Sequence, residues 1–261
     1  WSFVPATGPV CFTGELLRDL SAMQRAVRAA FVRDRGLRYL VSGSRIPGIY
    51  NLGGDLGLFT RLILAGDRAG LHDYARSCID VLYYNSVGLD LPLITVTLVQ
   101  GDALGGGFEA VLSHDIIVAE KKARFGLPEI MFNLFPGMGA YSFLRRRLGA
   151  AAAEKLILSG KTFTAEEMHA IGIVDVLAED GAGEAAVSEY LGRHGRRFNA
   201  HHGIIQVRRR VDPVSYDELA AVTDIWVDAA LRLDPVDLRK MERLLSAQAK
   251  LRTPGAVAVA S

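Results

Sequence analysis

The segment from Pro92 to Gly101, PLITVTLVQG, constrains the fold more than any other part of the chain. It has the length of a β-strand, is rich in β-branched residues and carries almost no charge. Such a run is typical of a strand that is buried on both faces, as in parallel sheets covered by helices on each side. The segment therefore predicts an α/β fold with helices packed on both faces of its sheet.

Strand-like and helix-like segments alternate along the first two thirds of the chain. The opening letters, WSFVP, are typical of an extended edge segment, and Asp67 is placed to cap a helix that runs to about Gly88. This alternation favours parallel strand pairing and the α/β fold class. We expect further helices over residues 16–31, 56–65 and 106–111, and strands over 37–44, 94–100, 116–119 and 171–177.

From about residue 180 onward the sequence is mostly helical. Capping-box patterns occur at Thr164–Glu167 and Ser215–Glu218, and Asp234 precedes a proline that suits the first position of a helix. We expect two C-terminal helices, over residues 215–233 and 235–250. The tail TPGAVAVAS, residues 253–261, is expected to be loose.

Charge and composition place the chain among ordinary globular proteins. The formal net charge is only +1, so no global field favours nucleic acid or an anionic membrane. No long apolar run and no secretion signal occur, so we expect a cytoplasmic protein. Because the first residue is Trp1 and not methionine, we expect the sequence to begin inside a longer chain. Whether a leader has been removed stays open.

Two local features could change that simple picture. The arginine runs 145–147 and 208–210 could bind an acyl carrier protein or a nucleotide phosphate, although solvated helix faces are the favoured interpretation. Cys11 and Cys78 lie far apart without metal-ligand spacing, so we expect two core thiols and neither a disulfide framework nor a metal site.

Three consecutive glycines, Gly105–Gly107, follow the apolar strand and begin a helix. Backbone N–H groups at such a position attract negative charge. The segment lacks the residues of a phosphate loop and the glycine order of a dinucleotide-binding fingerprint. These N–H donors suit an oxyanion hole better than a nucleotide-binding site. We expect Gly106 to be one donor and Gly53 or Gly54 of the loop YNLGGDL to be the other.

Two glutamates lie in apolar surroundings close to these glycines. Glu109 occupies the otherwise apolar helix GGGFEAVL, and Glu129 follows Leu-Pro in another apolar stretch. Carboxyl groups that share such a site have raised and separated pKa values, which gives one acid and one base. We expect the pair to move a proton between carbon and oxygen. Which glutamate is the acid stays open.

Histidines offer a weaker alternative. His114 is followed by Asp115, but adjacent side chains point in different directions, so no catalytic dyad follows. His201 and His202 are expected at the surface. No Gly-x-Ser-x-Gly motif occurs, which argues against an independent serine thioesterase.

The motifs ALGGGFE, FGLPEI and FPGMGA closely resemble those of the enoyl-CoA hydratase/isomerase, or crotonase, superfamily. The resemblance is strong over residues 39–177. It implies a spiral of ββα units with C-terminal helices that build trimers or hexamers. It also implies a crotonase-like catalytic core at 1–180 and a helical region for packing and oligomerisation at 181–261.

Within that superfamily the chain looks most like the synthases of diffusible signal factor, on the segments YNLGGDL, VQGDALGGGFEA, LPEIMFNLFPGMGAYSF, DIWVDAALRL and MERLLSAQAK. The resemblance implies that a 3-hydroxyacyl thioester is dehydrated and the cis-2-enoyl product hydrolysed to a free fatty acid, a quorum-sensing signal. No cofactor is implied beyond the acyl carrier protein phosphopantetheine or coenzyme A that carries the substrate.

The resemblance assigns residues to these roles. Glu109 and Glu129 match the catalytic carboxylates, and Gly106 with Gly53 or Gly54 matches the oxyanion hole. The residues that match substrate-binding positions are Leu104, Gly105, Met138, Trp226 and Leu244. Two alternatives stay open: a plain 2-enoyl-CoA hydratase or isomerase that uses the same glutamates, and a binding module that sequesters a sensor protein. Neither a nucleic acid nor a membrane partner is expected.

Overall fold

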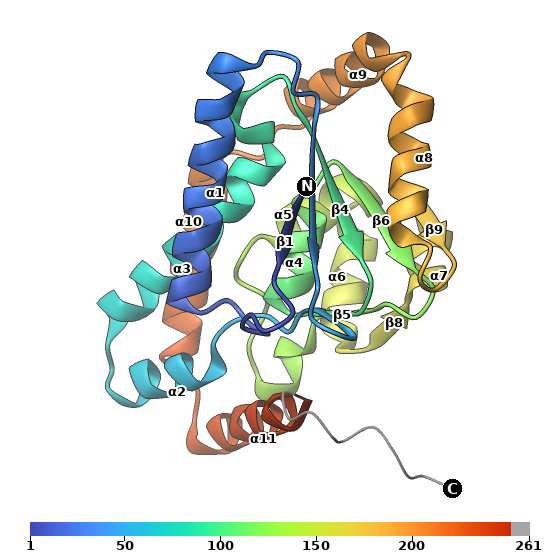
Figure 1. The fold of residues 1–261 in the computed structure, drawn as a ribbon. Coiled ribbons are helices and arrows are strands. Elements are labelled where there is room, and N and C mark those ends of the chain that lie inside the picture. The colour runs from blue at the N-terminus through green and yellow to red at the C-terminus, as the bar shows by residue number, and fades with distance from the viewer. Residues whose placement is uncertain (252–261) are drawn as a thin grey trace, which may run out of the picture.

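The computed structural model describes residues 1–251, and for residue 245 and residues 247–251 it describes the backbone only. The loose tail predicted for residues 253–261 lies outside the described residues. A parallel five-stranded sheet forms the centre of the fold (Figure 1). Its strands, in spatial order, are β1 (Ser2–Val4), β2 (Tyr39–Ser44), β4 (Ile94–Val99), β6 (Ile116–Glu120) and β9 (Val176–Ala178).

Strand β4 is the apolar run from which the fold was predicted, and it is buried on both faces. Ile94, Val96 and Leu98 point to one face, where helices cover the sheet through Val187 and Ile205. Thr95 and Thr97 alternate with them and are also fully buried, so their hydroxyl groups need partners. Thr97 donates to the Tyr50 hydroxyl group at 2.9 Å, and Thr95 donates to the Asp115 carboxylate at 3.1 Å.

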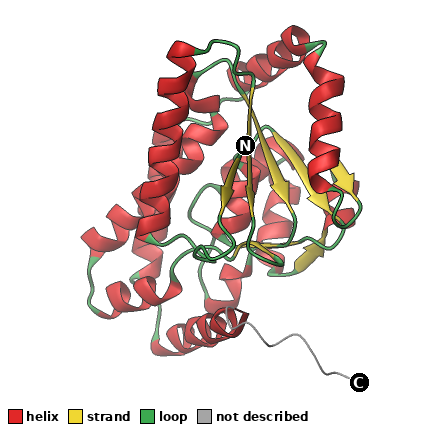
Figure 2. Ribbon diagram, viewed as in Figure 1, coloured by secondary structure: helices red, strands yellow, loops and turns green. Residues whose placement is uncertain are grey.

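Helices surround this sheet, as Figure 2 shows in red. Helices α8 and α9 cover one face, and α1, α3 and α10 lie along the other side of the molecule (Figure 1). The helix bounds are α1 (Gly14–Arg33), α2 (Leu56–Leu64), α3 (Arg68–Ser86), α4 (Gly106–Leu112), α5 (Ala140–Leu148), α6 (Ala150–Ser159), α7 (Ala165–Ala170), α8 (Gly183–Gly195), α9 (Phe198–Val211), α10 (Tyr216–Ala230) and α11 (Pro235–Leu251). None of these helices has the length and apolarity that a bilayer crossing requires.

A second, smaller sheet was not predicted. It consists of β3 (Ile49–Asn51), β5 (Asp102–Leu104), β7 (Arg124–Gly126) and β8 (Thr162–Thr164), of which only β8 runs antiparallel to its neighbour. Two short 3₁₀ helices, η1 (Gly88–Asp90) and η2 (Pro128–Phe132), complete the described elements. The α/β architecture predicted from the sequence is confirmed, and its small sheet places β5 directly before the glycine triplet.

Several local predictions need correction. The strand predicted over 171–177 is only the short β9, because residues 171–175 form a turn that buries Ile173. The capping box at Thr164 is present, whereas at Ser215 only half of it forms. Ser215 accepts the N–H of Glu218 at 3.1 Å, but the Glu218 carboxylate pairs with Arg146 at 2.7 Å and leaves the box open.

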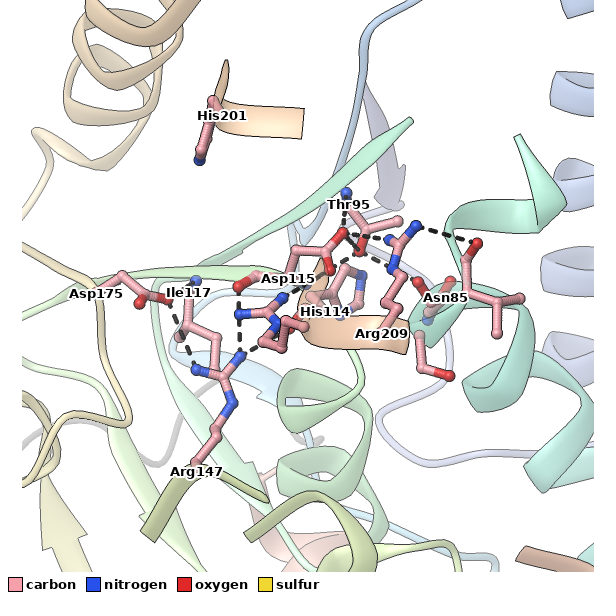
Figure 3. Close-up of polar contacts among 12 residues, drawn as sticks. Asn85, Thr95, His114, Asp115, Ile117, Arg147, Asp175, His201 and Arg209 are labelled. Carbon is pink, nitrogen blue, oxygen red and sulfur yellow. Dashed lines mark hydrogen bonds and ion pairs between the residues drawn. The ribbon is translucent and has the colours of Figure 1, made fainter. Parts of the chain in front are cut away.

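The favoured interpretation of the arginine runs holds for half of their residues, because Arg145, Arg208 and Arg210 are exposed. It is wrong for Arg146, Arg147 and Arg209, which are partly buried and form ion pairs. Arg208 and Arg209 bind the Asp115 carboxylate at 2.8 and 2.6 Å, and Thr95 N–H donates to the same group at 2.9 Å (Figure 3). Arg147 donates to the His114 carbonyl group at 2.8 Å. These contacts tie α5 and α9 to the segment that follows α4, and we call them the Asp115 network.

Burial differs from the prediction at three other residues. Cys78 is fully buried as expected, but Cys11 is only half-buried because it lies in the loop that leads into α1. His201 and His202, expected at the surface, are half-buried, since α9 packs beside α8. His201 contacts the Tyr190 hydroxyl group at 3.1 Å, and His202 stacks on Phe198.

Candidate active site

A cavity of about 260 Å³ opens between the small sheet and the helices α2, α3, α10 and α11. Every residue proposed for the site from the sequence lines this one cavity. They are Gly53, Gly54, Leu104, Gly105, Gly106, Glu109, Glu129, Met138, Trp226 and Leu244. The fold thus brings together residues from five separate stretches of the sequence.

Glu109 lies within α4 and is only 1% exposed. Its Oε1 accepts the N–H groups of Met138 at 2.7 Å and Ala140 at 2.8 Å, at the beginning of α5. Burial raises the pKa of this carboxyl group, and the backbone N–H donors oppose that rise because they stabilise the charged form. Helix α5 therefore orients the carboxylate without neutralising it.

Glu129 lies on η2, on the other side of the glycine triplet. Its Oε2 is buried and has no hydrogen-bond partner in residues 1–251. Burial raises the pKa of Glu129, and the nearby charge of Glu109 raises it further. Glu129 thus holds its proton more firmly than an ordinary glutamate, while Glu109 is the carboxylate that receives N–H bonds.

The three glycines are needed for three different contacts. Gly105 has φ +53°, and a Cβ atom there would lie 2.6 Å from Glu129 Oε1. A Cβ atom on Gly106 would lie 2.5 Å from the sulfur of Met138, and one on Gly107 would overlap the Asn51 carbonyl oxygen. The absence of side chains at the triplet therefore allows Glu129, Met138 and strand β3 to pack directly against its backbone.

The two glycines of the other loop are not equivalent. Gly53 has φ +98°, and its N–H donates to Asn51 Oδ1 at 2.8 Å, so this amide is occupied. The amides of Gly54 and Gly106 have no acceptor within the described part of the chain. A Cβ atom on Gly106 would lie 3.5 Å from Gly54 N, which shows how closely the two amides approach. Gly54, and not Gly53, has the amide that is open to a ligand.

The remaining wall of the cavity is apolar. Trp226 packs its ring on the bare backbone of Gly137 and contacts Phe59, with ring centroids 5.0 Å apart. Because Gly137 directly precedes Met138, this packing supports the segment that holds Glu109. Such apolar walls with a few convergent polar groups are typical of ligand sites.

The sequence did not predict the part of this wall that comes from α2 and α3. Phe59, Tyr74, Ala75 and Cys78 all line the cavity. On α3 the last three belong to the buried face of an amphipathic helix, which has the same spacing whether it meets a core or a ligand. Asn51 was missed as well, because its side chain acts locally on Gly53.

The alternative histidine pair lies outside the cavity. His114 Nδ1 contacts the Ala110 carbonyl oxygen at 2.9 Å, whereas the Asp115 carboxylate binds arginines, so the two residues form no dyad, as expected. Within the described residues, no group of three or more histidine, cysteine or acidic side chains is arranged to hold a metal ion.

Comparison with known sequences gives the following matches. The profile of the enoyl-CoA hydratase/isomerase family matches residues 44–190. The mitochondrial methylglutaconyl-CoA hydratase of Rattus norvegicus is 30% identical over 194 residues, which cover 71% of this chain and 56% of that protein. The chain thus spans about half the length of the curated relatives it matches.

Comparison with solved structures supports the same architecture. An enoyl-CoA hydratase from Bacillus halodurans matches with a TM-score of 0.71 and 19% identity, over 87% of this chain and 89% of that one. The human mitochondrial delta3-delta2-enoyl-CoA isomerase also matches with a TM-score of 0.71, at 18% identity, over 90% and 88% of the two chains. These likenesses concern the fold.

Proposed function

Because the chain belongs to the enoyl-CoA hydratase/isomerase family, we propose that its cavity binds an acyl thioester and interconverts its 3-hydroxyacyl and 2-enoyl forms. One observation carries the proposal: Glu109 and Glu129 both line a single apolar cavity, beside two amides that have no acceptor within the described residues. This arrangement suits a reaction in which a proton leaves carbon while charge develops on a neighbouring oxygen.

The environments of the two glutamates support different roles. We assign Glu109 as the base, because two backbone N–H groups stabilise its charged form. Glu129 is assigned as the acid, because burial and the charge of Glu109 keep it protonated. In dehydration, Glu109 takes the proton from Cα, the Cα–Cβ double bond forms, and the 3-hydroxyl group leaves as water with the proton of Glu129.

The thioester oxygen needs donors during this step. When Cα loses its proton, the electron pair delocalises onto the carbonyl oxygen as an enolate. We propose that the N–H groups of Gly54 and Gly106 bind that oxygen, since Gly53 N–H is already bonded to Asn51. One such donor is worth roughly 10²–10³-fold in kcat in enzymes with an oxyanion hole.

The finer proposal is synthesis of a cis-2-unsaturated fatty acid signal. The segments quoted above, such as YNLGGDL and LPEIMFNLFPGMGAYSF, support it by their resemblance to synthases of diffusible signal factor. In this reaction a 3-hydroxyacyl chain on acyl carrier protein is dehydrated. Water then adds to the thioester carbonyl carbon, the carbon–sulfur bond breaks, and the free acid and the carrier thiol are released.

The alternative is a 2-enoyl-CoA hydratase or isomerase, which would use the same carboxylates on a coenzyme A thioester. The family profile and the names of the relatives favour this simpler activity. The apolar wall of Phe59, Tyr74, Ala75, Cys78 and Trp226 supports an extended acyl chain under either proposal.

One experiment separates the two. Purified protein is incubated with a 3-hydroxyacyl carrier protein and, separately, with crotonyl-CoA, and the products are identified by mass spectrometry. Release of a 2-unsaturated free acid supports the signal synthase. Reversible hydration of crotonyl-CoA without acid release supports the hydratase, and no turnover of either thioester contradicts both.

Assembly and partners belong to the same proposal. We propose a homotrimer or hexamer built through the C-terminal helices, with acyl carrier protein or coenzyme A as the carrier and a sensor protein as a possible regulatory partner. A role purely in sequestering a sensor predicts that Glu109→Gln and Glu129→Gln leave the cellular phenotype unchanged. Loss of the phenotype in both variants would exclude that role.

A further inference from the structure

The two amides proposed for the oxyanion hole are supported unequally. Gly106 N–H lies at the first residue of α4, whereas Gly54 N–H belongs to the loop between β3 and α2. Gly53 and Gly54 are consecutive glycines, and glycine permits more backbone conformations than any other residue. The peptide group that joins them therefore needs contacts from outside the loop if its N–H is to keep one direction. Such contacts come from the segment before α1 and from Tyr74 on α3.

The segment before α1 holds the carbonyl side of that peptide group. Phe12 N–H donates to the Gly53 carbonyl oxygen at 2.8 Å, and Phe12 forms an isolated parallel β-bridge with Gly54. In a planar trans peptide, the Gly53 carbonyl group and the Gly54 N–H point to opposite sides. The bond from Phe12 therefore turns Gly54 N–H away from Phe12. Gly54 lines the candidate active site and Phe12 does not.

The Tyr74 hydroxyl group joins the same two segments. It donates to the Phe12 carbonyl oxygen at 2.5 Å and accepts a hydrogen bond from Asp55 N–H at 3.0 Å. In a parallel bridge between Phe12 and Gly54, the bond from Phe12 N–H has a companion that runs from Asp55 N–H to the Phe12 carbonyl oxygen. The hydroxyl group lies between these two atoms and bonds to both. The peptide groups on both sides of Gly54 are thus held against the same segment.

These two bonds occupy the hydroxyl group of Tyr74. Its single proton is donated to Phe12, and one of its lone pairs accepts the N–H of Asp55. Tyr74 is only 8% exposed, and burial raises the pKa of its hydroxyl group well above the usual value. The hydroxyl group stays protonated at neutral pH and could not give its proton to a substrate without breaking the bridge.

The ring of Tyr74 makes a separate contact. It packs edge-on against the ring of Phe59, with ring centroids 5.1 Å apart. The Phe59 ring lies in turn on the backbone of Gly54, where a Cβ atom would come within 2.6 Å of Phe59 Cζ. Because phenylalanine retains the ring, Tyr74→Phe keeps this packing and removes only the hydroxyl group and its bonds.

We infer that Tyr74 is a positioning residue of the oxyanion hole: its hydroxyl group ties Asp55 N–H to the Phe12 carbonyl oxygen and so fixes the direction of Gly54 N–H. The inference rests on the proposed function, since the oxygen that Gly54 N–H binds belongs to the acyl thioester. Tyr74 acts through the backbone and exchanges no proton with the substrate. Its effect is therefore larger on the transition state, in which that oxygen carries charge, than on substrate binding.

Tyr74→Phe tests the inference, and Tyr50→Phe is the matched control. Tyr50 is 9% exposed, its hydroxyl group accepts a hydrogen bond from Thr97 at 2.9 Å, and it does not line the candidate active site. Each variant thus loses one buried, hydrogen-bonded hydroxyl group. Thermal unfolding gives the folded fraction of each, and turnover of crotonyl-CoA and of a 3-hydroxyacyl carrier protein is expressed per folded molecule.

We expect Tyr74→Phe to lower kcat about tenfold, a part of the roughly 10²–10³-fold worth of one oxyanion-hole donor. KM should change less than about twofold, because the lost stabilisation belongs to the transition state. The pH profile of kcat should keep its shape. Tyr50→Phe should keep kcat and lose only stability.

Amide hydrogen exchange tests the bridge without any substrate. In the unmodified chain the N–H groups of Phe12 and Asp55 should be protected from exchange. In Tyr74→Phe both should exchange about tenfold faster, the change that corresponds to the loss of one hydrogen bond. Tyr50→Phe should leave both rates unchanged.

Four results would overturn the inference. They are unprotected Phe12 and Asp55 amides in the unmodified chain, an unchanged kcat in Tyr74→Phe, an equal loss of kcat in Tyr50→Phe, and the loss of one limb of the pH profile in Tyr74→Phe. The last result would make Tyr74 an acid or a base. If the unmodified chain turned over neither thioester, the proposed function would fail, and the exchange rates would still decide whether Tyr74 fixes the loop.

Discussion

Helix α4 and the residues directly after it contain two buried carboxylates with contrasting partners. Glu109 accepts hydrogen bonds from two neutral N–H groups, and Oε2 of its neighbour Glu129 has no partner in the part of the chain that the structure describes. Asp115, only 3% exposed, binds two guanidinium groups and the N–H of Thr95. Asp115 thus pairs with arginines and ties helices together, whereas within the described residues neither Glu109 nor Glu129, the pair that we expect to exchange protons, forms an ion pair.

Another buried glutamate sharpens this comparison. Glu120, at the end of β6, is 0% exposed. Its carboxylate pairs with Lys122 Nζ at 2.8 Å and accepts a hydrogen bond from Gln100 Nε2 at 2.7 Å. Burial acts to raise its pKa, but the bonds from Lys122, Gln100 and backbone amides together lower it. Burial alone therefore does not separate the candidate catalytic glutamates from Glu120. Within the described residues, the ion pair with Lys122 does.

The largest expected effect is on catalysis. Glu109→Gln and Glu129→Gln should each lower turnover by roughly 10²–10⁴-fold, because each removes a positioned acid or base. Thermal unfolding should be unchanged or slightly shifted upward, since an ionisable group leaves an apolar cavity. Steady-state kinetics and calorimetry measure both quantities.

Glu120→Gln is the matched control for Glu109→Gln, because Glu120 is as buried as Glu109 but does not line the cavity. It should lose stability and keep its turnover. If this variant lost as much activity as Glu109→Gln, the contrast between the two kinds of buried glutamate would fail.

The second effect concerns the Asp115 network. Asp115→Asn should lower the free energy of unfolding by about 3 kcal/mol, because Arg209 stays largely buried without its counter-charge. Arg208 is half-exposed and contributes little to this cost. Urea denaturation measures the change. Turnover per folded molecule should stay close to that of the unmodified chain, and a large loss of turnover without loss of stability would contradict the division of roles.

The third effect is on the pH dependence of stability. The pKa values of Glu109 and Glu129 are raised in the folded state, so above the ordinary carboxyl range the folded chain retains protons that the unfolded chain has released. The free energy of unfolding should therefore fall as pH rises through that window, by at most about 1.4 kcal/mol per pH unit for each group. Denaturation curves at a series of pH values measure the slope.

Glu120 should act in the opposite direction, because its pKa is lowered in the folded state. Its contribution is present above the ordinary carboxyl range and is lost as pH falls through the lowered value. Glu129→Gln should thus flatten the loss of stability toward alkaline pH, and Glu120→Gln the loss toward acidic pH. The same slope in both variants would refute the comparison.

The smallest effect concerns the apolar part of the same cavity. Cys78 and Ala75 contribute small side chains from α3, so Cys78→Leu should reduce the space for the acyl chain. We expect kcat/KM for long acyl thioesters to fall about tenfold relative to crotonyl-CoA. Cys78→Ala is the control and should keep the preference for long chains. A uniform loss over all chain lengths in Cys78→Leu would indicate disturbed folding and not a shorter cavity.

Much of the fold could be predicted because its signals are local and strong. The apolar run at 92–101 predicted a buried parallel strand, and the capping residues Asp67 and Asp234 marked helix starts that the structure contains. The small sheet escaped prediction because each of its strands is three residues long, too short for a two-residue alternation to be recognised.

Only part of the candidate site could be predicted, because only local signals can be read from the sequence. The motifs around Gly106, Glu109 and Glu129 are contiguous and therefore visible in the sequence. The occupied amide of Gly53 depends on where the Asn51 side chain points, and the pairing of Arg208 with Asp115 depends on contacts between distant segments. The catalytic roles of these residues, and the division of the chain at residue 180, stay predictions.

The packing of Trp226 on Gly137 has a practical consequence. The chain contains two tryptophans; Trp226 is 5% exposed in the wall of the cavity, and Trp1 is 54% exposed at the far end of the sequence. Their fluorescence spectra should differ in wavelength, because one indole ring is surrounded by hydrocarbon and the other by solvent. Replacing Trp1 with phenylalanine would leave a single tryptophan, in the wall of the cavity, and excitation at a wavelength that tyrosine does not absorb would follow ligand entry in real time without any added dye.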